Sequence, residues 1–126
     1  MNIGSIAASA LNAFSVDMHV RAHNIANVNT NGFISQDTAF MSGPRDEGVT
    51  VASIYNTYAP SSPQPAVITS NENGREFYVA GALEGNNLDL GHEFIRMIAS
   101  QRAFEANAAV IRTHDDISGT FLDLKV

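Results

Sequence analysis

The sequence predicts a mostly α-helical protein with a small β-rich middle, in which long N- and C-terminal helices form a coiled-coil-like pair. Helix breakers are concentrated in the middle: residues 32–91 hold all four prolines and seven of the nine glycines. Apolar residues at both ends recur with alternating spacings of four and three, which is the pattern of a narrow helical seam. We therefore divide the chain into an N-terminal helix within residues 1–31, a β-rich middle at 32–88 and a C-terminal helix within 89–126.

The N-terminal helix is expected over Ser5–Asn27. Counting from Ala7 in steps of four and three places an apolar side chain at every position of the seam except Arg21. The apolar members after Ala7 are Leu11, Phe14, Met18, Ile25 and Val28. A cluster of asparagines follows, and because asparagine side chains compete for backbone hydrogen bonds, the helix is expected to end there.

The middle is expected to contain strands joined by turns. Seven of the eleven residues in Gly48–Tyr58 are β-branched or aromatic, which favours a strand. Three prolines in residues 59–65 then favour an extended connector. Val67–Thr69 and Phe77–Val79 flank Asn73-Gly74, which is a strong signal for a β-hairpin.

The C-terminal helix is expected over Leu90–Leu124. Seven of ten seam positions counted from Leu90 are apolar. At 1.5 Å per residue this helix is about 52 Å long, whereas a compact globule of this size is about 36 Å across. We therefore expect a rod-like or assembling molecule rather than a compact enzyme.

Composition excludes several kinds of function. The 126 residues carry a formal charge of −6 and no cysteine, so disulfides, thiolate nucleophiles and cysteine metal sites are absent. The seven Lys and Arg residues are scattered, which makes nucleic acid a poor partner. No apolar run reaches the roughly 20 residues of a membrane span. The N-terminus lacks the basic start of a secretory signal, so if the protein leaves the cytosol we expect it to do so without a cleaved peptide.

No group of residues predicts catalysis, and we expect neither enzymatic activity nor a cofactor. His114, Asp115 and Asp116 are adjacent in a helix, so their side chains diverge by about 100° per residue and do not converge on a substrate. His19 and His23 are four residues apart and share a helix face, a spacing that can hold a metal. The alternative function is therefore a small soluble periplasmic or cytoplasmic binding protein that uses these histidines, although solvated or interface histidines are the simpler interpretation.

Two segments have a more specific order of residues. The first runs from Asn24 to Phe33 as Asn-Ile-Ala-Asn-Val-Asn-Thr-Asn-Gly-Phe. The second begins with Asn87-Leu88-Asp89-Leu90 and includes Gln101-Arg102-Ala103-Phe104-Glu105-Ala106-Asn107. Together they resemble the terminal signatures of the bacterial flagellar basal-body rod protein family. The short middle, with Gly48-Val49-Thr50-Val51, is similar to that of the short proximal-rod members.

The resemblance implies a structural subunit of the periplasmic flagellar rod, delivered by the flagellar type III export apparatus. Its partners would be further copies of itself, other rod subunits, the MS ring and that apparatus. It also implies that both terminal helices pack into the inner tube of a helical array. The residues expected at this assembly interface are Leu11, Phe14, Met18, Asn24, Ile25, Ala26, Asn27, Asn29, Thr30, Gly32, Phe33, Phe94, Met97, Gln101, Arg102, Phe104, Asn107, Ile111 and Leu122.

Overall fold

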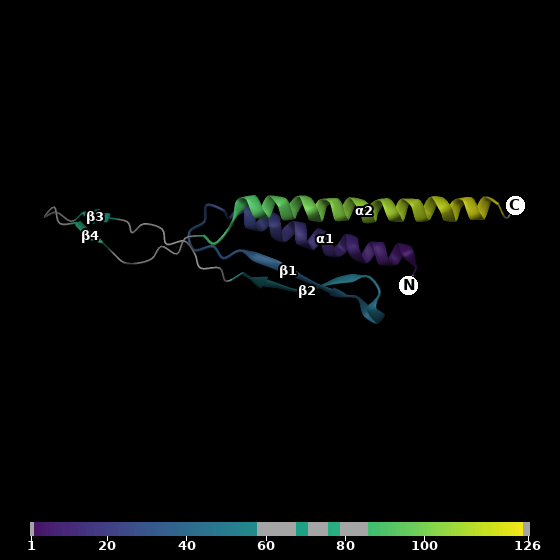
Figure 1. The fold of residues 1–126 in the computed structure, drawn as a ribbon, viewed down its shortest axis with the longest axis horizontal. Coiled ribbons are helices and arrows are strands. Elements are labelled where there is room, and N and C mark those ends of the chain that lie inside the picture. The colour runs from purple at the N-terminus through teal and green to yellow at the C-terminus, as the bar shows by residue number, and fades with distance from the viewer. Residues whose placement is uncertain (1, 58–67, 71–75, 79–85, 125–126) are drawn as a thin grey trace.

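Two long helices at the ends of the chain dominate the structure, a computed structural model that describes residues 2–57, 68–70, 76–78 and 86–124. Helix α1 spans Ile3–Ala26 and helix α2 spans Leu90–Asp123. They lie side by side and run in opposite directions (Figure 1). The two predicted helices are confirmed, and their ends lie within two residues of the expected ones.

Side chains at the helix ends explain these limits. The Asn2 side chain accepts a hydrogen bond from the Ser5 amide at the start of α1, and Asp89 accepts one from the His92 amide at the start of α2. Both are N-caps, which satisfy backbone donors that have no partner within the helix. At the other end of α1, Asn27 donates its backbone amide to His23 and Asn24, and the chain then turns away.

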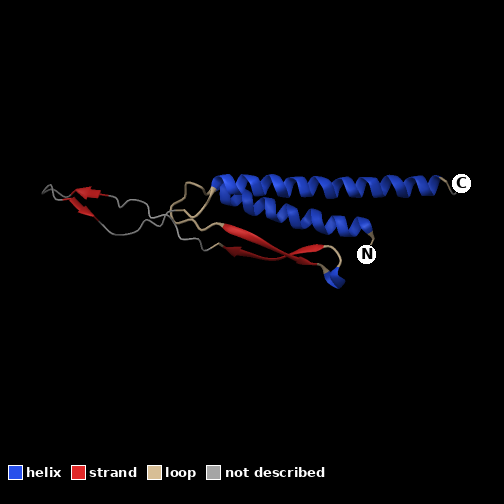
Figure 2. Ribbon diagram, viewed as in Figure 1, coloured by secondary structure: helices blue, strands red, loops and turns tan. Residues whose placement is uncertain are grey.

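A β-hairpin lies along α1 (Figure 2). It consists of β1 (Gln36–Ser42) and β2 (Val49–Asn56), which pair antiparallel with a register shift between Ala39 and Phe40. A short 3-10 turn at Pro44–Asp46 joins them. The predicted strand over Gly48–Tyr58 is confirmed as β2, but its partner β1 was not predicted.

A second pair of short strands forms the other sheet. Strand β3 (Ile68–Ser70) pairs antiparallel with β4 (Glu76–Tyr78), which confirms the predicted hairpin. The proline-containing connector 59–65 and the Asn73-Gly74 turn lie outside the described residues.

The buried apolar core of the described residues is small. It contains only Ala7, Ala10, Ala13 and Val20, all on α1. Leu11, Phe14, Met18 and Ile25 of the predicted seam are half-buried instead. Apart from Ala7 and Arg21, which are seam positions, every buried residue of α1 lies one position before a seam residue, because the hairpin covers the flank of α1 next to the face that meets α2. The coiled-coil-like geometry of the pair stays a prediction.

Helix α2 continues beyond the point where α1 begins (Figure 1). Ile3, the first residue of α1, lies against the stretch of α2 from Ala109 to Ile117. The last turns of α2 therefore have no described helix or strand beside them. None of the described helices combines the length and hydropathy that a membrane crossing needs.

Candidate assembly surface and its polar node

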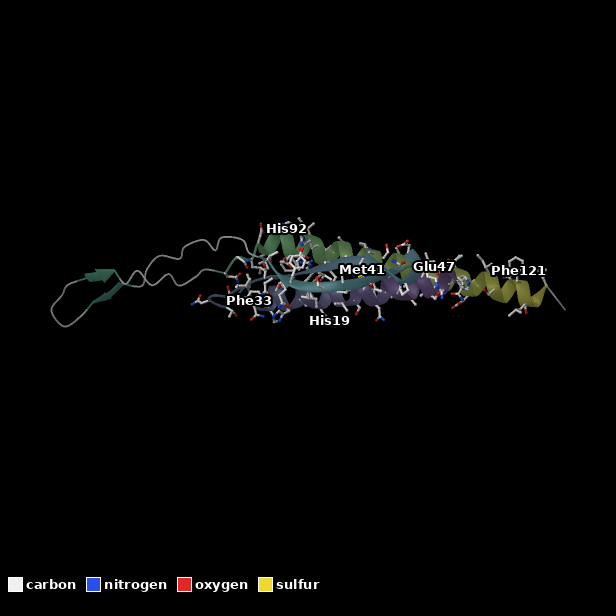
Figure 3. All side chains as sticks on the ribbon, turned by 90° about the horizontal axis from the view of Figure 1, so that it is seen from below. His19, Phe33, Met41, Glu47, His92 and Phe121 are labelled. Atoms are coloured by element: carbon white, nitrogen blue, oxygen red, sulfur yellow. The ribbon has the colours of Figure 1, made fainter. Side chains whose placement is uncertain are left out.

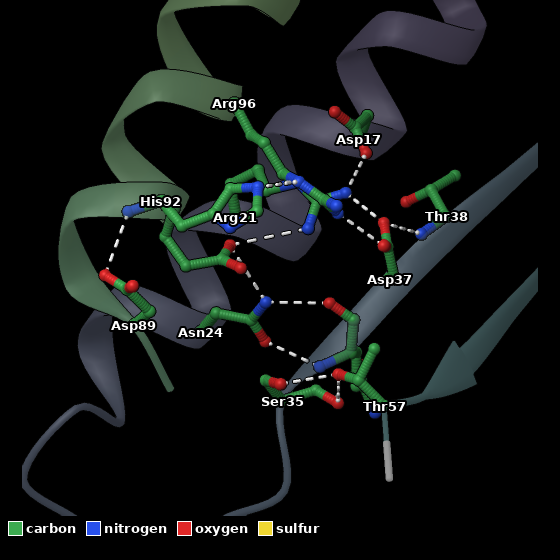
Figure 4. A network of polar contacts seen from close by, with 12 residues as sticks. Asp17, Arg21, Asn24, Ser35, Asp37, Thr38, Thr57, Asp89, His92 and Arg96 are labelled. Atoms are coloured by element: carbon green, nitrogen blue, oxygen red, sulfur yellow. Dashed lines mark hydrogen bonds and ion pairs between the residues drawn. The ribbon is translucent and has the colours of Figure 1, made fainter. Parts of the chain in front are cut away.

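Seven polar side chains meet where α1, β1 and α2 come together, and Figure 4 shows the part of this cluster around Arg21 and Asn24. We call this cluster the polar node. It consists of Asp17, Arg21, Asn24, Asp37, Glu93, Arg96 and Ser100, of which Asp17, Arg21, Asn24, Glu93 and Ser100 are buried. Burying charge is costly unless each charged group has partners, so the node depends on complete pairing.

Arg21 is the centre of the node, with only 3% of its surface exposed. One guanidinium nitrogen lies 3.0 Å from Asp17 of the same helix and also binds Asp37 of β1. The other terminal nitrogen lies 3.4 Å from Glu93 of α2. One side chain thus connects all three elements.

Asn24 makes the matching backbone contacts. Its amide group donates to the Gln36 carbonyl at 2.7 Å, and its carbonyl accepts from the Gln36 amide at 2.9 Å. The same amide group donates to Glu93 at 3.1 Å. Asn24 therefore serves as a backbone-like partner for the first residue of β1, which explains why an asparagine there ends up fully buried.

Two further pairs complete the node. Ser100 of α2 donates its hydroxyl to Asp17 of α1, and Arg96 of α2 donates to Asp37. Arg96 also donates to the ring of His92 at 3.0 Å, one turn earlier on α2. The node therefore contains two cations and three carboxylates, and each charged group has an oppositely charged or hydroxyl partner.

The pairing also shifts the pKa of two groups of the node, Asp37 and Arg21. Burial opposes the charged form of Asp37, but the hydrogen bonds from Arg21 and Arg96 outweigh it and lower the pKa of this carboxyl. Burial likewise opposes the charged form of Arg21, and its hydrogen bonds to Asp37 and Asp17 outweigh it and raise the pKa of the guanidinium. Both groups are therefore ionised at neutral pH.

Two asparagines before α2 tie the turn after α1 to the hairpin. Asn86 donates to the carbonyls of Asn27 and Val28, at 3.0 and 2.6 Å. Asn87 accepts from the Ser35 amide at 2.8 Å and donates to the Thr57 carbonyl. Asn86 and Asn87 thus satisfy backbone groups that have no partner within a helix or sheet.

The histidine pair shows no arrangement for a metal. The ring of His23 packs edge-on against Phe33, with ring centroids 5.4 Å apart, and its Nδ1 lies 3.5 Å from the Asn27 amide. His19 is exposed. Within the part of the chain that the structure describes, no three His, Asp or Glu side chains are grouped so that they could hold a metal ion.

Apolar side chains are uncovered at the end of α2 (Figure 3). Ile117, Phe121 and Leu124 are 52%, 70% and 77% exposed. Two apolar hollows lie here: one of about 430 Å³ between Ile3 and α2, and one of about 230 Å³ around Phe121. Ile117 lines both of them, so they form one continuous apolar face, which we call the α2 end face.

The predicted interface residues fall into three groups. Asn24 is buried in the polar node and is therefore occupied within the chain. Half-buried are Leu11, Phe14, Met18, Ile25, Asn27, Phe33, Met97, Phe104, Asn107 and Ile111. Exposed are Ala26, Asn29, Thr30, Gly32, Phe94, Gln101, Arg102 and Leu122. Their contact with another subunit stays a prediction.

Sequence reasoning missed most of the polar node. Asp17 and Arg21 are four residues apart, the spacing of an intrahelical ion pair, and this signal was available. Glu93 and Ser100 are seven residues apart and so share a face of α2, but both are polar and an apolar seam excludes them. Asp37 carried no signal because its strand was not predicted.

Family comparisons match the two ends of the chain. Residues 5–33, which contain most of α1 and the turn after it, match the family described as flagella basal body rod protein. Residues 79–124, which contain α2, match the family described as flagellar basal body rod FlgEFG protein C-terminal. Together the two matches cover more than half of the chain.

The individual relatives of this chain are also flagellar hook and rod proteins. The chain is 35% identical to the flagellar hook protein FlgE of Treponema pallidum over 105 residues, which is 80% of this chain and 22% of that protein. It is 32% identical to the flagellar basal-body rod protein FlgG of Bacillus subtilis over 59% of this chain and 28% of that protein. It is 44% identical to the hook protein FlgE of Escherichia coli over 36% of this chain and 11% of that protein. The chain thus spans less than a third of the length of each of these relatives.

Proposed function

We propose that this chain, which belongs to the flagellar basal-body rod and hook protein family, is a structural subunit of the flagellar rod that polymerises through its terminal helices. Members of this family are structural proteins rather than enzymes. Subunits joined by identical contacts that do not close on themselves form an open helical assembly, which can serve as a drive shaft around an axial channel.

One observation carries the proposal. The two segments that match the family lie 45 residues apart in sequence, and the structure brings them together as an antiparallel helix pair. The pair leaves the α2 end face uncovered, with side chains as large as phenylalanine and leucine exposed to water. Apolar faces of this kind mark association surfaces, and a second subunit is the partner that rod function supplies.

We assign the chain to the proximal rod, as an FlgC-like subunit. The support is the short middle: residues 32–88 separate the two terminal segments, whereas the relatives FlgE and FlgG are much longer proteins. Hook protein is the competing member of the family, because several of the relatives are hook proteins.

Location and partners follow from this assignment. The subunit would lie in the periplasmic part of the basal body and contact itself, other rod subunits and the MS ring. It would reach that place through the flagellar type III export apparatus.

Complementation of a gene deletion tests the proposal. We expect the deletion strain to be non-motile and to lack rods beyond the position of this subunit in electron micrographs of basal bodies. The wild-type gene should restore both. A Phe121→Asp variant should not, because it places a charge on the α2 end face, where burial against a neighbour carries a desolvation cost of several kcal/mol.

Ser118→Asp is the matched control. It adds the same charge to an exposed residue of the same helix turn that lines neither apolar hollow. We expect this variant to restore motility at the wild-type protein level. Normal motility of the Phe121→Asp strain would refute the role of this face, and normal basal bodies in the deletion strain would refute rod function. Complete rods without hooks in that strain would favour the hook.

A further inference from the structure

The turn between α1 and β1 holds an asparagine that is followed by glycine. The Phe33 amide donates to the Thr30 carbonyl at 3.2 Å, which closes a four-residue turn with Asn31 and Gly32 at its two central positions. Gly32 has a φ of 71°, which glycine adopts without strain. Both central residues are exposed. The turn therefore presents the peptide group between Asn31 and Gly32 to water.

Nothing in the described part of the chain restrains this peptide group. No acceptor there binds the Gly32 amide, and the Asn31 side chain makes no hydrogen bond to any described residue. A Cβ built on Gly32 would have no atom within 4 Å. The peptide plane can therefore rotate about the Asn31 Cα–C bond without losing a hydrogen bond or meeting a neighbour.

An unrestrained asparagine that precedes glycine is chemically reactive. Asparagine is among the residues least stable to heat, because the next backbone nitrogen can attack its side-chain carbonyl carbon. Here the Gly32 nitrogen would form a bond to Cγ of Asn31, while the Cγ–Nδ2 bond breaks and ammonia leaves with the proton of the Gly32 amide. Water then opens the succinimide ring at either carbonyl and gives aspartate or isoaspartate. Glycine favours the attack because it has no side chain to crowd the nitrogen.

We propose that Asn31 is a site of spontaneous deamidation, which converts faster than the other described asparagines. Each of the others precedes a residue that has a side chain. Asn24 is also fully buried, and Asn27 is held by hydrogen bonds within its turn. Asn29 is exposed like Asn31 but precedes Thr30, so it is the matched internal control.

The product changes the turn in two ways. Loss of the amide adds one negative charge to a chain whose formal charge is −6. Isoaspartate also routes the backbone through the side-chain carbonyl, which inserts one extra carbon between α1 and β1. The reaction needs only the Asn-Gly sequence and an open turn, so the site does not depend on the pairing of α1 with α2 or on assembly.

Peptide mass spectrometry of the full-length chain tests the proposal. The chain is incubated at mildly alkaline pH and sampled over days, and cleavage after Arg21 and Arg45 releases one peptide that contains both Asn29 and Asn31. Fragment ions assign the mass change to one asparagine, and an isoaspartyl methyltransferase detects the isoaspartate product. We expect Asn31 to convert at least tenfold faster than Asn29. Equal rates at the two positions overturn the proposal.

Two substitutions in the turn test the local chemistry. Asn31→Gln should abolish conversion at this position, because the longer side chain would have to close a larger ring. Thr30→Gly gives Asn29 a glycine neighbour and should raise conversion at Asn29 at least fivefold. Conversion of Asn31→Gln at the wild-type rate, or an Asn29 rate unchanged by Thr30→Gly, overturns the proposal.

Comparison with the unfolded chain tests whether the turn is open. In concentrated urea, Asn73, which also precedes glycine, supplies the reference rate of an unfolded Asn-Gly sequence. We expect Asn31 to match that rate in urea and to convert in native buffer at a rate within threefold of it. A rate in native buffer more than tenfold lower would show that the turn holds the Gly32 nitrogen away from Asn31 Cγ, and it would overturn the proposal.

Discussion

Replacing Arg21 with methionine is expected to remove much of the stability of the free subunit. The guanidinium is 3% exposed and pairs with three carboxylates. Asp37 keeps Arg96 after the substitution, but Asp17 and Glu93 keep only a hydroxyl and an amide partner. Breaking a buried ion pair by removing one partner typically costs about 3–5 kcal/mol.

A loss of this size is a large part of the total free energy of unfolding. Domains of this size are stable by roughly 5–15 kcal/mol, and the buried apolar core among the described residues is three alanines and a valine. With a urea m-value of about 1–3 kcal/mol per molar, the midpoint of unfolding should fall by roughly 2 M. Urea titration followed by helical circular dichroism measures this shift directly.

Arg102→Met is the matched control for this experiment. The side chain of Arg102 is 76% exposed and pairs with Glu105 at 2.9 Å on the same helix. Exposed pairs of this kind contribute little to stability, because water and salt screen the charges, so the midpoint should change little. A loss below about 1 kcal/mol for Arg21→Met would show that the polar node is not closely paired, and the reasoning would be refuted.

Three further predictions follow from other features. The pKa of Asp37 is lowered in the folded chain, so its pairing stabilises the fold at pH values above the ordinary carboxyl pKa of 3.8. The urea midpoint should therefore fall as the pH drops below that value, and the midpoint of Asp37→Asn should fall less steeply over the same range. Gly48→Ala should cost about 1–2 kcal/mol in urea unfolding, because Gly48 has φ of 74° and a Cβ there would lie 2.4 Å from a serine hydroxyl of α1. Gly119→Ala, with nothing within 4 Å, should instead add about 0.5–1 kcal/mol. His19→Ala with His23→Ala should leave motility intact, and loss of motility that added zinc restores would favour a metal site.

The long-range shape of the protein was predictable because it depends on local signals. Prolines and glycines exclude helix from the middle, and Asn2, Asn27 and Asp89 have side chains that end or begin helices. The helix limits therefore agree with the expected ones within two residues. Strand β2 was predictable from its β-branched residues, whereas β1 contains too few of them to stand out.

The polar node could not be predicted from periodicity. The alternating spacing of four and three selects apolar residues, and it therefore predicts Leu11, Met18 and Ile25 on the inner face of α1. Each of these residues is one position away from a buried polar or small residue. The cause is the hairpin, which covers one flank of α1 and whose position the sequence does not predict. Two of the three carboxylate partners of Arg21, Asp37 and Glu93, lie 16 and 72 residues away, and no local pattern connects them to it.

Isolation of hook–basal bodies tests the central claim most directly. A strain expressing this chain with an epitope tag, at its natural level and with normal motility, supplies the particles. If the chain is a rod subunit, the tag should co-purify with hook–basal bodies, and immunogold label should lie on the rod between the MS ring and the hook. Intact hook–basal bodies without the tag, from cells that contain the tagged chain, would contradict the account.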